Sequence, residues 1–209
     1  MADLKIGRMT VGMYGTNCYL VYREGGEQVI IIDPPDAGAK IYDKVKALGF
    51  NTFHILLTHG HFDHIMGTNE LKECAHAKVY AMDSDPRVCE DTRLNVSAQI
   101  GHPYAVKADE YFNGDTTFAL GDVEIKVFAT PGHTADSCCY YFEEAGFMVC
   151  GDTIFEESVG RTDLPTGSGS QLDKSVREKI FTLPDSTVLY PGHGDSTTVE
   201  HEKQYNPFF

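Results

Sequence analysis

Short apolar runs, each about the length of a β-strand, alternate with helical periodicity in the first quarter of the chain. Residues 18–22 and 29–32 predict two strands, and the two glycines at 25–26 favour a hairpin turn between them. Apolar residues recur at helical spacing in 41–48, just before a glycine that favours a helix end. Residues 53–57 form a mostly apolar run, typical of a strand with helices over both faces of its sheet. The pattern favours an α/β fold.

The rest of the chain continues this alternation with one interruption. Helices are predicted at 65–74 and 172–180, and strands at 78–81, 123–129, 137–142, 146–150 and 187–190. Residues 83–107 have no clear periodicity. An irregular stretch of this length inside a domain is typical of a functional flap. His102 within it is therefore a candidate substrate contact.

Two β-α-β units echo each other along the chain. In the first, a strand ending at Asp33 is followed by a helix and by a strand ending in His-Gly-His at 59–61. In the second, a strand ending at Asp152 is followed by a helix and by a strand ending in Pro-Gly-His-Gly-Asp at 191–195. Ligands of such sheets gather at the carboxyl ends of the strands. We expect two halves whose strand ends face one cleft.

The histidines are concentrated at one of these strand ends. His59, His61 and His64 lie within six residues, with Asp63 between them. Around a strand-to-helix turn, alternating residues can point into one concavity while the next reaches in from the first helical turn. Imidazole and carboxylate together suit zinc, iron or manganese better than calcium. Three histidines and an aspartate at this spacing indicate a metal site rather than a polar loop.

Three further strand ends carry residues of the same kind. His133 lies in Pro-Gly-His-Thr, Asp152 in Gly-Asp-Thr and His193 in Pro-Gly-His-Gly, each after a predicted strand. The neighbouring glycines let the backbone turn tightly near a crowded centre. Each of these turns, taken alone, is as consistent with an ordinary loop as with a metal site. Four strand ends bearing ligand-type residues predict a shared metal centre.

Composition restricts the class of protein and its partners. At 209 residues, we expect one globular domain spanning 1–209. A formal charge of −14 disfavours a nucleic-acid partner, because phosphate binding needs a basic surface. No apolar run approaches the ~20 residues of a membrane span. Asp3, Lys5 and Arg8 interrupt the first ten residues, which therefore lack the apolar core of a signal peptide. We expect a cytoplasmic protein without a membrane partner; nothing in the pattern specifies its oligomeric state.

The cysteines form no Cys-x-x-Cys pair and no compact disulfide framework. We expect reduced thiols that pack as small apolar residues: Cys18, Cys74, Cys89, Cys138, Cys139 and Cys150. Cys138 and Cys139 are adjacent on a predicted strand, so their side chains should point to opposite faces of the sheet.

Together these motifs resemble the metallo-β-lactamase superfamily, whose signature Thr-His-x-His-x-Asp-His is matched in full by residues 58–64. The resemblance continues in order along the chain, at 16–19, 131–134, 151–153 and 191–194. It implies an α/β fold of the four-layer αββα sandwich type. His54, His76 and His201 match no motif, and we expect them at the surface or in packing contacts.

The resemblance also implies two ligand sets. The first metal would be bound by His59, His61 and His133, the second by Asp63, His64 and His193, and Asp152 would bridge them. Two metals that share a water lower its pKa from about 15.7 towards about 7, which supplies hydroxide to attack a carbonyl carbon. Asp63 would orient this hydroxide and manage its proton. We expect two divalent ions, zinc first, with iron or manganese as alternatives.

Within the superfamily, the chain is similar to glyoxalase II, the hydroxyacylglutathione hydrolases, and above all to short bacterial proteins of this kind. Residues 151–155 and 159–165 carry this similarity. It implies that Arg161 holds the glutathione portion of a small thioester such as S-D-lactoylglutathione, since an arginine pairs with a carboxylate through two parallel hydrogen bonds. The alternative is a surface ion pair between Arg161 and Asp163. Longer glyoxalase II enzymes end in a helical glutathione-binding domain, which we do not expect here, and this leaves the identity of the thiol open.

Rival functions share parts of the same motif set. A persulfide dioxygenase uses one iron, for which His59, His133 and Asp152 would be the ligands. Lactonases share the full ligand set. β-Lactamases lack the combination of His64 with a bridging Asp152, flavodiiron reductases carry an acid at position 61, and a nuclease is disfavoured by the charge. A metal-dependent scaffold protein would not need every ligand intact.

Overall fold

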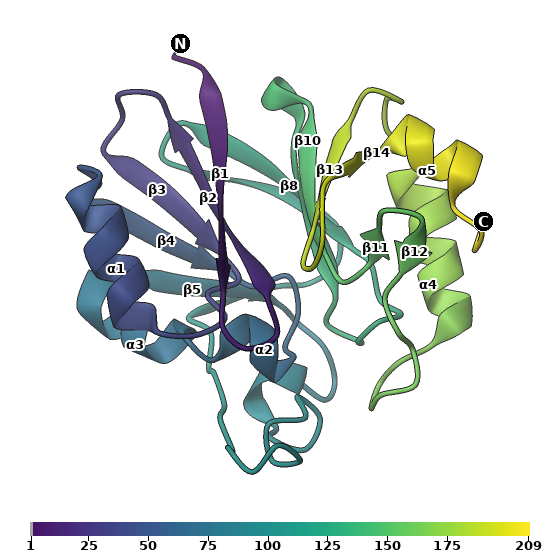
Figure 1. The fold of residues 1–209 in the computed structure, drawn as a ribbon, viewed down its shortest axis with the longest axis horizontal. Helices are drawn as coiled ribbons and strands as arrows, with labels where there is room; N and C mark the ends of the chain where they lie inside the picture. The colour runs from purple at the N-terminus through teal and green to yellow at the C-terminus, as the bar shows by residue number, and fades with distance from the viewer. Residues whose placement is uncertain (1) are drawn as a thin grey trace.

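Two six-stranded sheets lie face to face in the middle of the molecule (Figure 1). The computed structural model describes residues 2–209. The first sheet has the order β1 (Leu4–Val11), β2 (Thr16–Arg23), β3 (Gln28–Ile32), β4 (Thr52–Leu56), β5 (Lys78–Met82) and β6 (Glu110–Phe112). The second sheet has the order β14 (Thr197–Thr198), β13 (Val188–Pro191), β10 (Phe147–Gly151), β9 (Cys138–Phe142), β8 (Val123–Ala129) and β7 (Thr116–Leu120).

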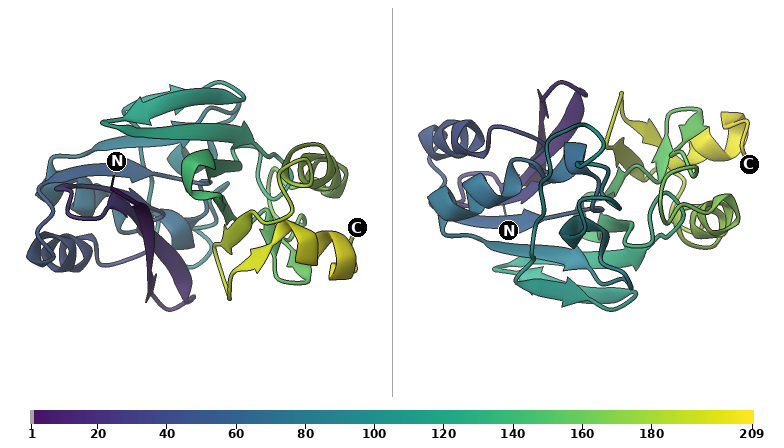
Figure 2. Two further views of the ribbon diagram at one scale, coloured as in Figure 1. Left: turned by 90° about the horizontal axis from the view of Figure 1, so that it is seen from above. Right: turned by 90° about the horizontal axis from the view of Figure 1, so that it is seen from below.

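Helices cover the outer face of each sheet. On the first sheet lie α1 (Gly38–Ala47) and α3 (Thr68–Ala75), and on the second lie α4 (Gly169–Ser175) and α5 (Val199–Tyr205). The views from above and below show these helices at opposite flanks of the molecule, with the sheets between them (Figure 2). The helical turns that continue α4 to Ile180 are π-type. The four-layer αββα sandwich expected from the sequence is confirmed.

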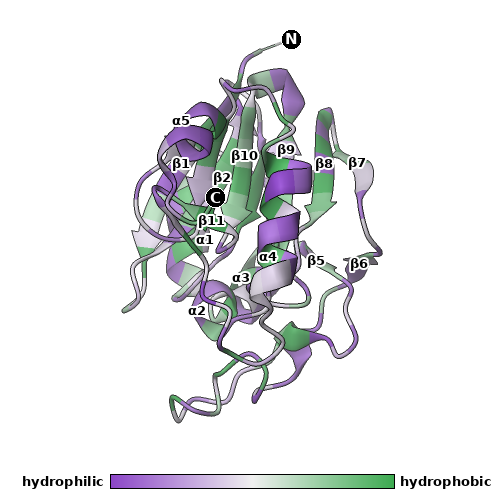
Figure 3. Cartoon of the chain, turned by 90° about the vertical axis from the view of Figure 1, so that its right-hand side faces the viewer, coloured by the Kyte–Doolittle hydropathy of each residue, from purple (hydrophilic) through white to green (hydrophobic). Residues whose placement is uncertain are grey.

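The main core fills the space between the sheets. Ile30 and Ile32 of β3 meet Tyr140 of β9 and Val149 of β10 there, all of them fully buried. Burying one such side chain contributes about 1.5–3 kcal/mol. Coloured by hydropathy, the strands are mostly apolar, whereas the exposed turns of α4 and α5 are largely hydrophilic (Figure 3). The alternation of apolar residues along the strands therefore determines which face of each sheet packs against the other sheet.

Neighbouring strand residues divide between the layers, as β9 illustrates. Cys138 packs in the core between the sheets, whereas Cys139 packs outward among residues beneath the helices of the second sheet, such as Val176 and Ile180. The predicted opposite orientation of the two thiols is confirmed. Five of the six cysteines are buried, and Cys74 on α3 is partly exposed.

Several elements differ from the sequence expectations. The helix predicted at 65–74 is split into α2 (Phe62–Ile65) and α3, because Gly67 closely approaches the backbone of Pro34 and Asp36. The helix predicted at 172–180 begins earlier, at Gly169, where the Ser168 side chain caps its first turn. The apolar pattern missed β1, β6, β7, β14 and α5, whose exposed residues are mostly polar, and the short hairpin of β11 (Ile154–Phe155) and β12 (Ser158–Val159). Among residues 2–209, no helix has the length and apolar character needed to cross a membrane.

The irregular segment at 83–109 connects β5 to β6 with a single 3-10 turn, Val88–Glu90. It is held by its own hydrogen bonds, such as Asn95 Nδ2 to the Tyr104 carbonyl at 2.8 Å. The Asn95 carbonyl in turn accepts a hydrogen bond from the Phe62 amide at 3.0 Å, which fastens the segment to the start of α2. The predicted irregularity is confirmed, and the segment packs against the histidine-rich turn.

Parallel strand pairs bring the predicted site together. β3 and β4 run parallel with Ile32 opposite Leu56, and β10 and β13 run parallel with Gly151 opposite Pro191. The carboxyl ends of parallel strands meet at the same edge of a sheet. The chain that follows each of these four strands therefore emerges at the same end of the sandwich, the lower end in Figure 1.

Candidate metal centre

The predicted ligands converge at this end of the sandwich in two clusters. His59, His61 and His133 form the first, and Asp63, His64 and His193 form the second; within each, the possible ligand atoms lie within 4.8 Å of one another. His61 Nδ1 lies 2.8 Å from His133 Nε2 in the first cluster. His193 Nε2 lies 3.3 Å from Asp63 Oδ2 in the second.

Asp152 lies between the two clusters. One carboxylate oxygen, Oδ1, is 3.3 Å from His64 Nε2. The other, Oδ2, is 3.6 Å from both His133 Nε2 and His193 Nε2. The structure thus brings together all seven residues that the sequence singled out, with Asp152 in contact with both sets.

The unpaired polar atoms of this centre fit a metal. Within residues 2–209, the buried atoms His59 Nε2 and His61 Nε2 have no hydrogen-bond partner. Buried polar groups without partners are rare and costly in proteins, unless an ion or water satisfies them. Imidazole nitrogens and carboxylate oxygens in this number are the donors that divalent zinc, iron or manganese prefer.

Protonation in the first cluster also favours metal binding. Burial, together with the neighbouring imidazoles, holds the pKa of His59 well below its usual range. Burial and the nearby His133 lower the pKa of His61 to about 3. Both rings are therefore neutral at physiological pH and can donate a lone pair to a metal.

The second cluster is electrostatically different. Burial alone would raise the pKa of Asp152 and lower that of His64, but their attraction for each other dominates both. The pKa of Asp152 is lowered, and Asp33 joins Asp152 in raising that of His64 well above its usual range. Without a metal, His64 carries a proton that a bound cation must displace.

Backbone and carboxylate acceptors around the clusters orient the rings. His64 Nδ1 lies 2.9 Å from Asp33 Oδ2, and His133 Nδ1 lies 2.7 Å from the Arg161 carbonyl oxygen. Donation from Nδ1 to such an acceptor fixes the tautomer and leaves Nε2 for a metal. In the sequence, Asp33 is recognisable only as a strand end, and the carbonyl of Arg161 leaves no trace there.

Asp33, His59 and His64 also lie close enough to form a third possible cluster. The Asp33 carboxylate, however, already accepts hydrogen bonds from the Thr58 amide at 2.7 Å and the Thr58 hydroxyl at 2.6 Å, in addition to that of His64. We therefore assign Asp33 as a support for His64 rather than as a metal ligand.

Glycines next to the ligands are required by close packing. A Cβ on Gly192 would lie 2.2 Å from Asp152 Oδ1 and 2.5 Å from His64 Cε1, inside the metal centre itself. Gly132 has a φ of 145°, and a Cβ there would lie 2.3 Å from the backbone nitrogen of Leu172. These residues explain why the sequence places glycine before both His193 and His133.

A cleft of about 750 Å³ opens over the clusters. His61, Asp63, His133, Asp152 and His193 lie at its base, and Arg161 lies on its wall. Arg161 also forms two hydrogen bonds with Asp163, at 2.7 and 2.8 Å, in an exposed ion pair. The surface ion pair with Asp163 is confirmed and Arg161 also borders the cleft, while its contact with substrate stays a prediction.

The remaining histidines lie outside the clusters. His54 is half-buried beside Tyr80, His76 is exposed at the end of α3, and His201 pairs with Glu157 at 3.1 Å. His102 lines a smaller hollow next to Asp63. Asp63 lines the same hollow, and the substrate contact expected of His102 stays a prediction.

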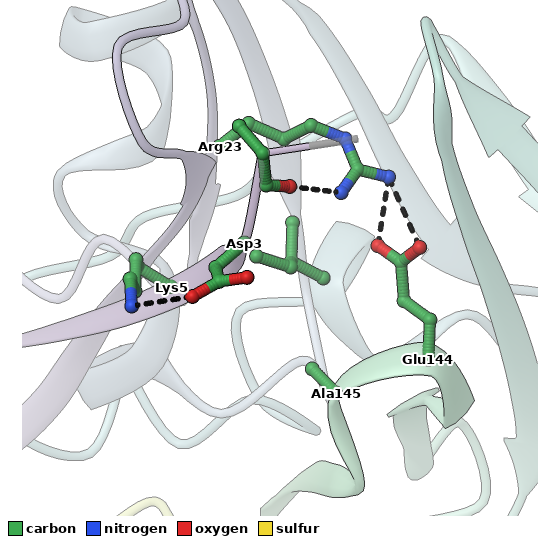
Figure 4. A pocket seen from close by; sticks show the side chains of 7 residues that line it. Asp3, Lys5, Arg23, Glu144 and Ala145 are labelled. Carbon is green, nitrogen blue, oxygen red and sulfur yellow. Dashed lines mark hydrogen bonds and ion pairs between the residues drawn. The ribbon is translucent and has the colours of Figure 1, made fainter.

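Another pocket lies at the opposite end of β2, where the strand finishes at Arg23 (Figure 4). Arg23 bridges Glu144 at 2.8 Å and Asp122 at 2.6 Å, and Lys5 pairs with Asp3 at 3.2 Å. These side chains neutralise one another in ion pairs. The pocket therefore has a structural role, because its ion pairs connect the N-terminal strands to the second sheet.

The comparisons with known proteins agree with this geometry. Residues 11–193 match the family model described as the metallo-beta-lactamase superfamily. The chain is 36% identical over 207 residues to "Probable metallo-hydrolase YqgX" of Bacillus subtilis. This match covers 98% of this chain and 97% of that protein. It is 28% identical to "Hydroxyacylglutathione hydrolase GloC" of Haemophilus influenzae, over 98% of both chains.

Solved structures resemble the whole chain. The B3 metallo-beta-lactamase BLEG-1 has a TM-score of 0.92 and 32% identity, over 98% of this chain and 99% of that one. The di-iron-bound form of TTHA1623 has a TM-score of 0.84 and 30% identity, over 97% and 100%. ETHE1 from Myxococcus xanthus has a TM-score of 0.78 and 28% identity, over 97% and 83%.

The chain therefore belongs to the metallo-β-lactamase superfamily. Its histidine and aspartate clusters, together with this family, define a metal-dependent hydrolase.

Proposed function

We propose that the chain hydrolyses a small thioester of the S-D-lactoylglutathione type, with two divalent ions, zinc in the first instance, held by the seven clustered residues. One observation carries the proposal: two complete three-residue clusters, in contact through Asp152, form the base of a cleft that Arg161 borders. Two ions held there would polarise the thioester carbonyl and acidify a water at neutral pH.

The residues of the chain have separate tasks in this reaction. Asp63, 3.3 Å from His193 Nε2 and at the base of the cleft, takes a proton from the attacking water. The water oxygen forms a bond to the carbonyl carbon, the carbon–sulfur bond breaks, and the sulfur leaves with the electron pair. The proton then passes to the thiolate, giving a carboxylic acid and a thiol. Thiolates leave readily because a cysteine thiol such as that of glutathione has a pKa of about 8.5.

Arg161 fits the thiol portion of such a substrate. Its guanidinium is exposed at the cleft wall, and a substrate carboxylate can replace Asp163 in the two parallel hydrogen bonds. The similarity to GloC, named a hydroxyacylglutathione hydrolase, supports a thioester of glutathione.

Two other functions compete with this proposal. In the one-iron persulfide dioxygenase hypothesis, only His59, His133 and Asp152 hold metal. The second cluster of Asp63, His64 and His193 is then without a purpose, and this favours the two-metal hydrolase. The likeness to BLEG-1 makes β-lactam hydrolysis the second candidate, while the full ligand set is equally suited to a lactone.

The test compares substrates on one preparation of metal-loaded protein. Thiol release from S-D-lactoylglutathione is measured beside hydrolysis of nitrocefin and of an acyl-homoserine lactone, and beside oxygen uptake with glutathione persulfide. We expect thioester cleavage to exceed the other reactions at least tenfold in kcat/KM. Oxygen uptake without thioester cleavage would overturn the proposal.

A matched pair of variants tests the substrate contact. Arg161→Ala should raise KM for S-D-lactoylglutathione about 10- to 100-fold with a smaller effect on kcat, since it removes binding rather than chemistry. Arg93→Ala removes an arginine from a similar exposed pair, with Asp91, that does not line the cleft, and should leave KM unchanged. Equal effects of the two substitutions would show that Arg161 does not contact substrate.

A further inference from the structure

A second hollow, with a volume of about 310 Å³, reaches Asp63 but not Arg161. Its walls come from the turn between β1 and β2, the loop before α1, the end of α2 and the irregular segment at 83–109. The turn between β1 and β2 and the irregular segment lie beside α2 at the lower end of Figure 1 and on the face seen from below in Figure 2. The hollow is a neighbour of the catalytic cleft rather than part of it.

Exposed apolar side chains gather around this hollow. In the described chain, six large hydrophobic side chains are exposed, and three of them line it: Met13 at 93%, Tyr14 at 52% and Ile100 at 41%. Met66 adds a further apolar wall. Single exposed apolar residues are ordinary, but a contiguous group beside a cleft marks a binding surface.

The hollow and the catalytic cleft share a wall. Tyr14, Asp63 and Ile100 line both spaces. The Tyr14 ring contacts the Phe62 ring edge-on, with 4.9 Å between their centroids. This pair lies at the boundary between the hollow and the cleft, at the start of α2. A substrate whose reacting carbon lies near Asp63 can therefore extend one arm into each space.

Charge distinguishes the two arms. Arg161 borders the cleft, whereas no lysine or arginine lines the hollow among the described residues. The Asp36 carboxylate at its edge is turned to the start of α1, where it accepts a hydrogen bond from the Ala37 amide at 2.6 Å. An anionic thiol such as glutathione therefore suits the cleft, and an uncharged apolar group suits the hollow.

We propose that this hollow binds the acyl chain of the thioester, an unbranched apolar chain of roughly six to ten carbons, while the thiol portion extends towards Arg161. This inference rests on the proposed thioester hydrolysis. A space of 310 Å³ has room for about ten water-sized atoms, far more than a lactoyl group fills. Each methylene buried against Met13, Met66 and Ile100 strengthens binding up to about fourfold.

Kinetics with a series of S-acyl glutathiones test the proposal. From lactoyl through butanoyl and hexanoyl to octanoyl, kcat/KM should rise at least tenfold and then fall for chains longer than the hollow. Met13→Ser and Ile100→Ser should reduce the ratio of octanoyl to lactoyl cleavage at least fivefold. Leu48→Ser, an equally exposed apolar residue at the end of α1, should leave this ratio unchanged.

Binding to metal-free protein gives a readout independent of catalysis. Met13 and Met66 line the hollow, whereas Met148 is fully buried in another cluster and serves as an internal control. With methionine methyls labelled by ¹³C, S-octylglutathione should shift the NMR signals of Met13 and Met66 but not that of Met148. S-methylglutathione should leave all three in place.

The outcomes separate this inference from the proposed function. Efficient cleavage of lactoyl and octanoyl thioesters at equal rates, with no shift at Met13 or Met66, would overturn the acyl subsite and leave thioester hydrolysis standing. Methionine shifts with S-octylglutathione, together with cleavage of an N-octanoyl lactone and of no thioester, would support the apolar subsite and overturn the thioester. Equal shifts with S-methylglutathione would assign the hollow to the thiol arm and overturn the inference.

Discussion

The carboxylate of Asp33, at the end of β3, lies 2.9 Å from His64 Nδ1 in the first turn after β4. This contact exists because β3 and β4 are parallel neighbours whose carboxyl ends coincide. It turns His64 Nε2 towards Asp152, which lies 3.3 Å away. Asp33 thus supports the metal centre through the His64 ring that it orients, and it also holds the Thr58 hydroxyl, which lies 3.1 Å from His59 Nδ1.

Asp33→Asn should weaken binding at the second metal site. An amide is a poorer acceptor than a carboxylate, and loss of such a support costs about 10- to 100-fold in metal affinity. Competition with a chromogenic chelator measures the affinity, and circular dichroism checks that the fold is kept. Asp43→Asn, at an exposed position on α1, is the control and should bind both ions normally. Unchanged affinity in Asp33→Asn would contradict the role of the contact.

His59→Ala should abolish metal loading at the first site together with activity. The His59 ring is buried, and its Nε2 has no hydrogen-bond partner among the described residues, so it is available to donate its lone pair to a metal. Metal content per chain and thioester cleavage are measured on the same sample, and the far-UV spectrum should remain that of the wild type. Full activity in this variant would refute the ligand assignment.

Gly132→Ala should destabilise the protein much more than Gly146→Ala. Both glycines have a positive φ, so alanine costs backbone strain at either position, about 1–2 kcal/mol in the left-handed conformation of Gly146 and about 1–3 kcal/mol at Gly132, whose φ is 145°. Only at Gly132 does the added Cβ also meet the backbone of Leu172, whereas at Gly146 it meets open space. Overpacking adds about 1–3 kcal/mol. Urea unfolding measures the difference, and equal losses would show that the turn before His133 can relax.

Asp136 should make stability depend on pH. Burial raises its pKa from 3.8 to about 6, so between these values the folded state binds more protons than the unfolded state. The stability that this group contributes is therefore complete below pH 3.8 and is lost as the pH rises through about 6. A shift of this size corresponds to about 2–3 kcal/mol.

Asp136→Asn isolates this contribution in metal-free protein. The variant has no carboxyl group to ionise, so its stability relative to the wild type should rise by about 2–3 kcal/mol between pH 4 and pH 7. Urea unfolding at several pH values supplies the comparison. A stability difference that does not change with pH would contradict the raised pKa.

The ligand residues could be predicted because each lies in a short motif at a strand end. The signature at 58–64 places four candidates within seven residues, and His133, Asp152 and His193 each follow an apolar run beside glycine. The carboxyl ends of parallel strands lie together at one edge of the sheet, whatever the conformation of the loops that connect them. Local pattern was therefore sufficient to bring these seven residues to one end of the sandwich, while their division into two ligand sets rests on the resemblance to the superfamily.

The surroundings of the centre depend on contacts between distant segments. The orientation of His133 rests on the Arg161 carbonyl, a backbone group that has no sequence signature. The apolar hollow needs the turn after β1, and the pattern missed β1 because Arg8 interrupts the apolar series of Leu4 and Ile6 in an edge strand. Only the packed fold brings Met13 beside Ile100.

The central claim is that two metal ions at these clusters drive thioester hydrolysis, and one titration tests it most directly. Metal-free protein receives increasing zinc while bound metal and thiol release from S-D-lactoylglutathione are followed together. The account predicts that two equivalents bind per chain and that full activity requires the second. Full thiol release with only one equivalent bound per chain, or no thiol release at any metal content, would contradict it.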